Sequence, residues 1–126
     1  MVRLNVFSWN VQGINDAKKR RGCLDIFKEK AVDVALLQET HLLYQDVCKL
    51  NNVDFKVAAF SAAKNRTKGV IILFRSNLKV SIIKKGQDQE GRIAYVKTII
   101  NCQKIAFISV YTPNTYNNLF FTSFNY

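Results

Sequence analysis

The chain has 126 residues, of which 48% are hydrophobic and 12% aromatic, so it corresponds to one domain or part of one rather than a disordered chain. Its 19 lysines and arginines stand against 9 acidic residues, and the net charge of +10 favours a polyanionic partner, nucleic acid first and an anionic membrane surface second. No apolar run has the length of a membrane-spanning helix, and polar residues interrupt the N-terminus, so neither a transmembrane helix nor a secretory signal is expected.

The first predicted elements form a strand, a helix and a second strand. Residues 2–9 alternate in hydropathy and predict a strand. Asn15 or Asp16 is expected to cap a helix that runs to about Glu29. The short apolar run at residues 32–37 predicts a buried strand.

A strand–helix–strand unit of this length predicts two parallel strands joined by a right-handed crossover. The carboxyl ends of parallel strands meet at the same edge of a sheet. Asn10 and Glu39 follow the two predicted strands, so we expect them at one edge, where open α/β sheets bind their ligands.

The rest of the chain changes character and predicts antiparallel strands joined by hairpin-like connections. The expected strands cover residues 55–60, 69–74, 78–84, 92–100 and 104–110.

Cysteine spacing indicates neither a disulfide framework nor a zinc site. Cys23, Cys48 and Cys102 are far apart, odd in number and without C-x-x-C spacing. Each has apolar neighbours, so we expect three buried thiols in a reducing compartment.

Three segments combine an apolar strand with a compact polar cluster. They are S-W-N-V-Q-G-I-N at residues 8–15, L-Q-E-T-H at residues 37–41 and V-Y-T-P-N at residues 110–114. Phosphodiester hydrolysis needs a hard divalent cation held by oxygen ligands, together with donors to the phosphate oxygens. These segments contain side chains of both kinds.

Five residues in these segments are candidates for such chemistry. Glu39 offers a metal-binding carboxylate, Asn10 and Asn114 offer neutral amides, and Tyr111 offers a hydroxyl donor. His41 is the chain's one histidine. Each also has an ordinary structural explanation, as a loop, turn or core residue, so the single residues leave the choice open.

The combination of motifs resembles the endonuclease/exonuclease/phosphatase superfamily, which includes exonuclease III and the apurinic/apyrimidinic endonucleases. S-W-N-V-Q-G-I-N is similar to its first motif, L-L-Q-E-T-H to its metal-site motif and Y-T-P-N to its third, in the same order. Lys68-Gly-Val-Ile-Ile-Leu-Phe and Glu90-Gly-Arg92 also resemble family segments. Thr40-His41 and Y-T-P-N-T point toward the endonucleases of non-LTR (LINE-type) retrotransposons. The resemblance extends from about Leu4 to Asn118.

The resemblance implies an α+β fold. Residues 1–126 would be the N-terminal part of a two-sheet β-sandwich flanked by helices, DNase I-like and four-layered α/β/β/α when complete, with the C-terminal half absent. The chain is expected to supply roughly one of the two sheets, whose inner face would then be exposed.

The resemblance also implies roles for the candidate residues. Glu39 and Asn10 would hold Mg²⁺, with Mn²⁺ as the alternative, while Tyr111 and Asn114 would contact the scissile phosphate. His41 resembles a residue near the site, without a definite role. Gln12 departs from the repair enzymes, which often carry an acidic residue there, and this reduces the negative charge available to the metal.

Two basic groups are candidates for contacts with the DNA backbone, and solvated surface is the alternative for both. They comprise Lys18, Lys19, Arg20 and Arg21 in the first two turns of the predicted helix, and Lys64, Arg66 and Lys68 in a predicted loop.

The family's G-D-x-N and S-D-H segments, which supply the water-activating residue and an Asp–His dyad, do not occur in these 126 residues. The sequence is therefore interpreted as part of a Mg²⁺-dependent DNA endonuclease from a retrotransposon polyprotein, inactive alone. A reverse transcriptase is expected downstream, with no membrane partner and with intracellular, nuclear action. Three alternatives remain: a phosphatase or phosphodiesterase acting on phosphoinositide, sphingomyelin or RNA tails, a non-catalytic basic nucleic-acid-binding module, and an inert remnant.

Overall fold

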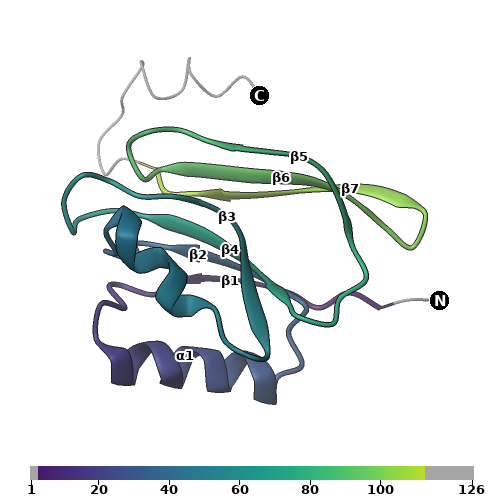
Figure 1. Ribbon diagram of the computed structural model, residues 1–126, viewed down its shortest axis with the longest axis horizontal. Coiled ribbons are helices and arrows are strands. Elements are labelled where there is room, and N and C mark those ends of the chain that lie inside the picture. The colour runs from purple at the N-terminus through teal and green to yellow at the C-terminus, as the bar shows by residue number, and fades with distance from the viewer. Residues whose placement is uncertain (1–2, 113–126) are drawn as a thin grey trace.

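The computed structural model describes residues 3–112 and shows a helix packed on two stacked sheets (Figure 1). Its elements in chain order are β1 (Val6–Asn10), α1 (Ala17–Glu29), β2 (Val34–Gln38), the 3-10 helix η1 (Tyr44–Leu50), β3 (Phe55–Ser61), β4 (Val70–Arg75), β5 (Ser81–Gln87), β6 (Ile93–Ile100) and β7 (Gln103–Val110).

The strands form a first sheet in the order β1-β2-β4-β3 and a second sheet in the order β5-β6-β7. β1 and β2 are parallel, which confirms the predicted strand–helix–strand unit. The later strands pair antiparallel with one another, as predicted, and β2 also pairs antiparallel with β4, a pair that the sequence did not predict. The expected hairpin connection between β4 and β5 is wrong, because the chain passes there from the first sheet to the second.

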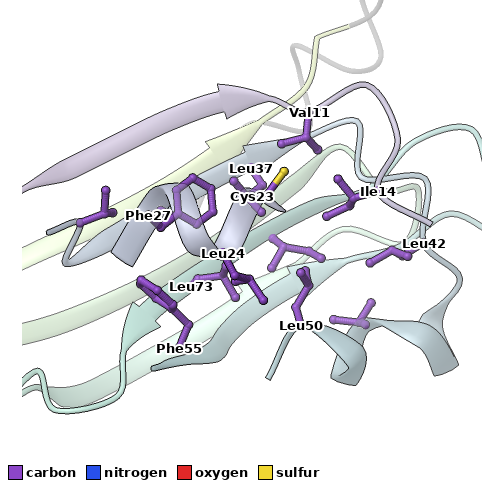
Figure 2. Packing of buried hydrophobic residues seen from close by; sticks show 14 residues of the cluster. Val11, Ile14, Cys23, Leu24, Phe27, Leu37, Leu42, Leu50, Phe55 and Leu73 are labelled. Atoms are coloured by element: carbon purple, nitrogen blue, oxygen red, sulfur yellow. The ribbon is translucent and has the colours of Figure 1, made fainter. Parts of the chain in front are cut away.

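Helix α1 covers the outer face of the first sheet. Asp16 begins it as the expected cap, since its side chain accepts a hydrogen bond from the backbone N–H of Lys18 at 3.1 Å. Phe27 is fully buried, and its ring lies 5.7 Å from Phe7, 6.1 Å from Trp9 and 6.0 Å from Phe55. Burial of such a side chain contributes about 1.5–3 kcal/mol. The ring contacts join the helix to β1 and β3, and Figure 2 shows Phe27 and Phe55 within this core.

The inner face of the first sheet packs on the second sheet. β4 alternates between the two cores, with Ile71 and Leu73 on the helix side and Ile72 and Phe74 between the sheets. Phe74 meets Phe107 of β7 at 5.8 Å. The expectation that the chain supplies roughly one sheet with an exposed inner face is therefore wrong. The β5–β7 meander folds back over the first sheet and buries that face along β2, β4 and β3, whereas Val6 and Ser8 of β1 stay exposed. The predicted α+β, two-sheet class is confirmed.

The three cysteines differ in how far they are buried. Cys23 is buried in α1, but Cys48 and Cys102 are exposed, so the expectation of three buried thiols is wrong for two of them. Cys102 occupies the tight β6–β7 turn with Asn101, where both residues have positive φ and face solvent. The turn itself was predicted as the connection between residues 92–100 and 104–110, but the apolar neighbours of Cys102 wrongly indicated a buried thiol. No helix among residues 3–112 is long and apolar enough to cross a membrane.

Candidate metal and phosphate site

Two strands of the first sheet and one of the second end at the same edge. Asn10 closes β1 and pairs with Gln38, the last residue of β2, so Glu39 lies directly beside the end of β1. Tyr111 follows β7 of the second sheet. The convergence expected from the parallel strands is confirmed.

The segment after β2 is held in an uncommon backbone conformation. Glu39 and His41 have φ values of +53° and +59°, a region that non-glycine residues seldom occupy. The Glu39 carbonyl accepts from Gly13 N–H at 2.7 Å, and Thr40 N–H donates to the Gly69 carbonyl at 3.0 Å. Thr40 is 1% exposed. The β1–α1 loop and the residue before β4 thus hold the backbone of Glu39 and Thr40 from both sides.

Tyr111 reaches Glu39 across the two sheets. A hydrogen bond between its hydroxyl and the Glu39 side chain raises the pKa of Tyr111, and burial and the Glu39 charge raise it further, whereas Arg92 lowers it. The phenol therefore keeps its proton at neutral pH and acts as a donor. This contact brings together two residues that lie 72 positions apart in the sequence.

A buried polar contact lies beneath this pair. Ser109 is 1% exposed, and its hydroxyl donates to the Leu37 carbonyl at 2.9 Å. Gln38 Nε2 donates to the Ser109 hydroxyl at 3.1 Å and to Ser8 Oγ at 3.3 Å. These bonds tie β7 to β2 one or two residues before Tyr111 and Glu39. Our sequence reasoning missed them, although a serine inside an apolar strand is a signal that could have found Ser109.

Asn10, Gln12 and His41 lie in the same group of loops. Asn10 Oδ1 accepts from the backbone N–H of Gln12 at 3.1 Å, and both side chains are exposed. The His41 ring lies against Gly13, where a Cβ would come within 2.8 Å of His41 Nδ1. His41 thus packs on the β1–α1 loop. Asn114, the remaining candidate, lies outside the described residues.

The donors fit a hard cation that keeps much of its own coordination shell. Glu39 supplies one carboxylate and Asn10 one amide oxygen, and residues 3–112 contain no group of three or more histidine, cysteine or acidic side chains placed to hold a metal. Mg²⁺ usually takes one or two carboxylates and fills its other positions with water and substrate phosphate. A thiolate–imidazole site for zinc does not fit here.

The basic residues of α1 lie beside this edge because the helix begins where β1 ends. Lys19 Nζ donates to the Gln12 carbonyl at 3.2 Å, and Arg20 Nη1 donates to the Asn15 carbonyl at 2.6 Å. These two side chains brace the β1–α1 loop, whereas Lys18 and Arg21 are exposed.

The β3–β4 loop brings the second basic group to the same edge. Lys64 and Arg66 are exposed, Lys68 is half-buried, and the Lys68 carbonyl accepts from His41 N–H at 2.8 Å. Arg66 lies 3.9 Å from Asp46, and this long ion pair is weak because the arginine is exposed. The two basic groups therefore flank Glu39, one on each side.

The sequence matches the Endonuclease/Exonuclease/phosphatase family over residues 7–121. The chain belongs to this family. It is 28% identical over 119 residues to the exodeoxyribonuclease of Bacillus subtilis (strain 168). The alignment covers 92% of this chain and 45% of that protein.

Solved structures of the same fold include the AP endonuclease LMAP of Leishmania major and the TDP2 of D. rerio in complex with a single-strand DNA product. The LMAP structure has a TM-score of 0.67 at 17% identity, and the superposition covers 94% of this chain and 43% of LMAP. The TDP2 structure has a TM-score of 0.66 at 21% identity, and the superposition covers 91% of this chain and 48% of TDP2. The chain thus spans less than half the length of these relatives. The predicted DNase I-like fold and superfamily are confirmed.

Proposed function

We propose that the chain is the N-terminal part of a DNA endonuclease that depends on Mg²⁺, with Mn²⁺ as the alternative. Family membership supports a nuclease or phosphodiesterase. The observation that carries the site is the meeting of β7 and β2 at the edge where Asn10 ends β1: Ser109 bonds Leu37 across the two sheets at 2.9 Å, and Tyr111 lies beside Glu39.

The roles of the residues follow from their chemistry. A bound divalent cation would polarise a phosphoryl oxygen and make a coordinated water more acidic. Glu39 and Asn10 would hold that cation. The Tyr111 phenol, which keeps its proton, would donate it to a phosphate oxygen of the substrate as it now donates to Glu39, and Asn114 would make a second phosphate contact.

The placement of positive charge supports a polyanionic substrate. Residues 18–21 are all basic and lie in the first turns of α1, where no acidic residue occurs. Positive side chains at the N-terminal end of a helix oppose the helix dipole and destabilise the helix. Phosphate groups bound there would offset this unfavourable charge interaction. With the β3–β4 loop on the other flank, a DNA backbone would be contacted on both sides of Glu39.

We further propose the biological setting that the motifs indicate. Thr40-His41 and Y-T-P-N-T support a non-LTR retrotransposon polyprotein that acts in the nucleus and carries a reverse transcriptase downstream. Residues 1–126 would form a partial domain, inactive alone, because the G-D-x-N and S-D-H segments do not occur in them. The likeness to relatives more than twice the chain's length supports this division.

Nicking of supercoiled plasmid tests the proposal. Residues 1–126 are compared with the longer protein that contains them, in Mg²⁺ or EDTA, as wild type, Glu39→Ala and Glu29→Ala. Glu29 is an exposed residue at the end of α1 and serves as the control. We expect no nicking by residues 1–126, and Mg²⁺-dependent nicking by the longer protein that Glu39→Ala abolishes and Glu29→Ala preserves.

Other outcomes distinguish the alternatives. Nicking by residues 1–126 that is lost in Glu39→Ala would show that the partial domain suffices. A longer protein that binds DNA equally well in EDTA and with Glu39→Ala, but never cleaves, would favour the non-catalytic basic module. Hydrolysis of phosphoinositides or RNA tails with no nicking would assign another chemistry of the superfamily.

A further inference from the structure

In the Glu90-Gly-Arg92 segment, Arg92 lies directly beside Tyr111. Ile93 and Val110 pair in the β6–β7 ladder, and Tyr111 N–H donates to the Arg92 carbonyl at 2.8 Å, which extends the ladder by one step. Arg92 and Tyr111 are thus cross-strand neighbours at the point where the second sheet reaches the site.

The Arg92 side chain contacts both the backbone and the ring of Tyr111. Its Nη1 donates to the Tyr111 carbonyl at 3.3 Å, and its guanidinium carbon lies 5.4 Å from the centre of the Tyr111 ring. A guanidinium at this distance from an aromatic face is attracted by the ring quadrupole. With the ladder bond, three contacts therefore join Arg92 to Tyr111.

The position of Arg92 is itself fixed from the first sheet. Asp88 Oδ1 accepts from Arg92 N–H at 3.2 Å and from the Ser61 hydroxyl of β3 at 2.6 Å. Gly91 N–H donates to Ser61 Oγ at 2.9 Å. Gly91 has a φ of +77°, and a Cβ there would come within 2.9 Å of the Gly69 backbone nitrogen, so glycine is required. A continuous series of contacts therefore links Ser61, Asp88, Arg92 and Tyr111 to Glu39.

We infer that Arg92 is a positioning residue for Tyr111: its guanidinium fixes the orientation of the phenol ring so that the hydroxyl meets the Glu39 carboxylate. The ring has two rotatable side-chain bonds and stands at the end of its strand, so the ladder bond alone fixes its backbone and not its direction. The importance of this orientation for catalysis rests on the proposed function, but the orientation itself does not.

Tyrosine ring resonances of the 126-residue chain test the inference without metal or DNA. The Tyr111 signal is assigned with Tyr111→Phe, and Arg92→Gln and Arg92→Lys are compared with Arg75→Gln. Arg75 is the matched control, because it pairs with Asp33 at the opposite end of the first sheet. We expect Arg92→Gln to displace the Tyr111 signal and Arg75→Gln to lower the melting temperature without displacing it.

The lysine variant keeps the inference testable if Arg92→Gln does not fold. Lysine retains the charge but not the planar guanidinium, so a folded Arg92→Lys protein should still show a displaced Tyr111 signal. An unchanged Tyr111 signal in a folded Arg92→Gln or Arg92→Lys protein would overturn the inference, as would an equal displacement in Arg75→Gln.

A double-mutant cycle asks whether Arg92 acts on the contact with Glu39. Glu39→Gln should displace the Tyr111 signal in the wild-type background, and this response should shrink when Arg92 is also replaced. Equal responses in both backgrounds would show that Arg92 stabilises the hairpin only. Since no cleavage is measured, failure here is distinct from failure in the plasmid assay.

Discussion

Gly69 couples the start of β4 to the Glu39 segment, and Gly69→Ala is the substitution whose effect the structure predicts most fully. Gly69 has a φ of +122°, and a Cβ built there would overlap Thr40 Oγ1. Thr40 is 1% exposed and has no room to move. The Gly69 backbone also accepts from Thr40 N–H and donates to the Gly91 carbonyl, both at 3.0 Å, so a shift would break two hydrogen bonds.

The magnitude has two parts. A non-glycine residue in so sparsely populated a backbone region costs about 1–3 kcal/mol, and the extra methyl in a packed site costs a further ~1–3 kcal/mol. We therefore expect Gly69→Ala to lower the free energy of unfolding by about 2–6 kcal/mol. Gly22→Ala is the matched control, since nothing lies within 4 Å of its built Cβ and the position is helical; it should raise stability by about 0.5–1 kcal/mol.

Urea unfolding followed by the fluorescence of Trp9, the chain's single tryptophan, measures these changes. Thr40→Ala removes the overlapping hydroxyl, so in the double mutant it should recover about 1–2 kcal/mol of the Gly69→Ala loss. A loss below about 1 kcal/mol for Gly69→Ala, or strictly additive losses in the double mutant, would refute the steric reasoning.

Three further predictions follow from described contacts. Arg75→Gln should lower the free energy of unfolding by about 2–3 kcal/mol in urea titrations, because it leaves the nearly buried Asp33 without its cation. The partly exposed Arg75 is screened by solvent, which keeps the loss from being larger. A loss near zero would contradict this prediction. Burial raises the pKa of the Cys23 thiol, so a thiol reagent should modify the two exposed cysteines quickly and Cys23 only on unfolding; three equal rates would contradict this. The pKa of Tyr111 is raised above 10.0, chiefly by the hydrogen bond that its hydroxyl donates to Glu39. The contribution of this bond to stability is therefore present below pH 10.0 and is lost as the pH rises through the raised pKa. An absorbance titration should show a tyrosine ionisation at high pH. This ionisation should be absent in Tyr111→Phe and should shift to lower pH in Glu39→Gln.

The sequence predicted the parts of the fold that depend on local periodicity. The helix cap at Asp16, the parallel β1–β2 pair and most later strands were correct, because apolar spacing and capping act within a few residues. The boundaries were less accurate, since β1 begins at Val6 rather than residue 2 and β5 at Ser81 rather than residue 78. The passage from one sheet to the other after β4 was missed, because a short polar turn looks the same whether the next strand pairs locally or crosses the core.

The contacts of the candidate site likewise divide into those that the sequence predicted and those that it did not. The meeting of Asn10 and Glu39 followed from parallel strands, but the contact of Tyr111 with Glu39 depends on how two sheets stack, which no periodicity encodes. Arg92 was noticed as part of a motif, yet its contact with Tyr111 depends on the β6–β7 register. Ser109 was overlooked because a serine in a strand also has many ordinary explanations. The structure shows where most of the candidate residues lie, but the roles of all of them in function, Asn114 and the basic residues included, stay predictions.

The location of Glu39 on one sheet and Tyr111 on the other has a thermodynamic consequence. A ligand that engages both residues would cross-link the halves of the sandwich, and it would bind the folded chain but not the unfolded one. Such a ligand raises stability by about 2.7 kcal/mol at a hundredfold excess over its dissociation constant. The shift in melting temperature would then report occupancy of the site without any measurement of cleavage, and cations, phosphates and oligonucleotides could be ranked by the melting temperature that each produces.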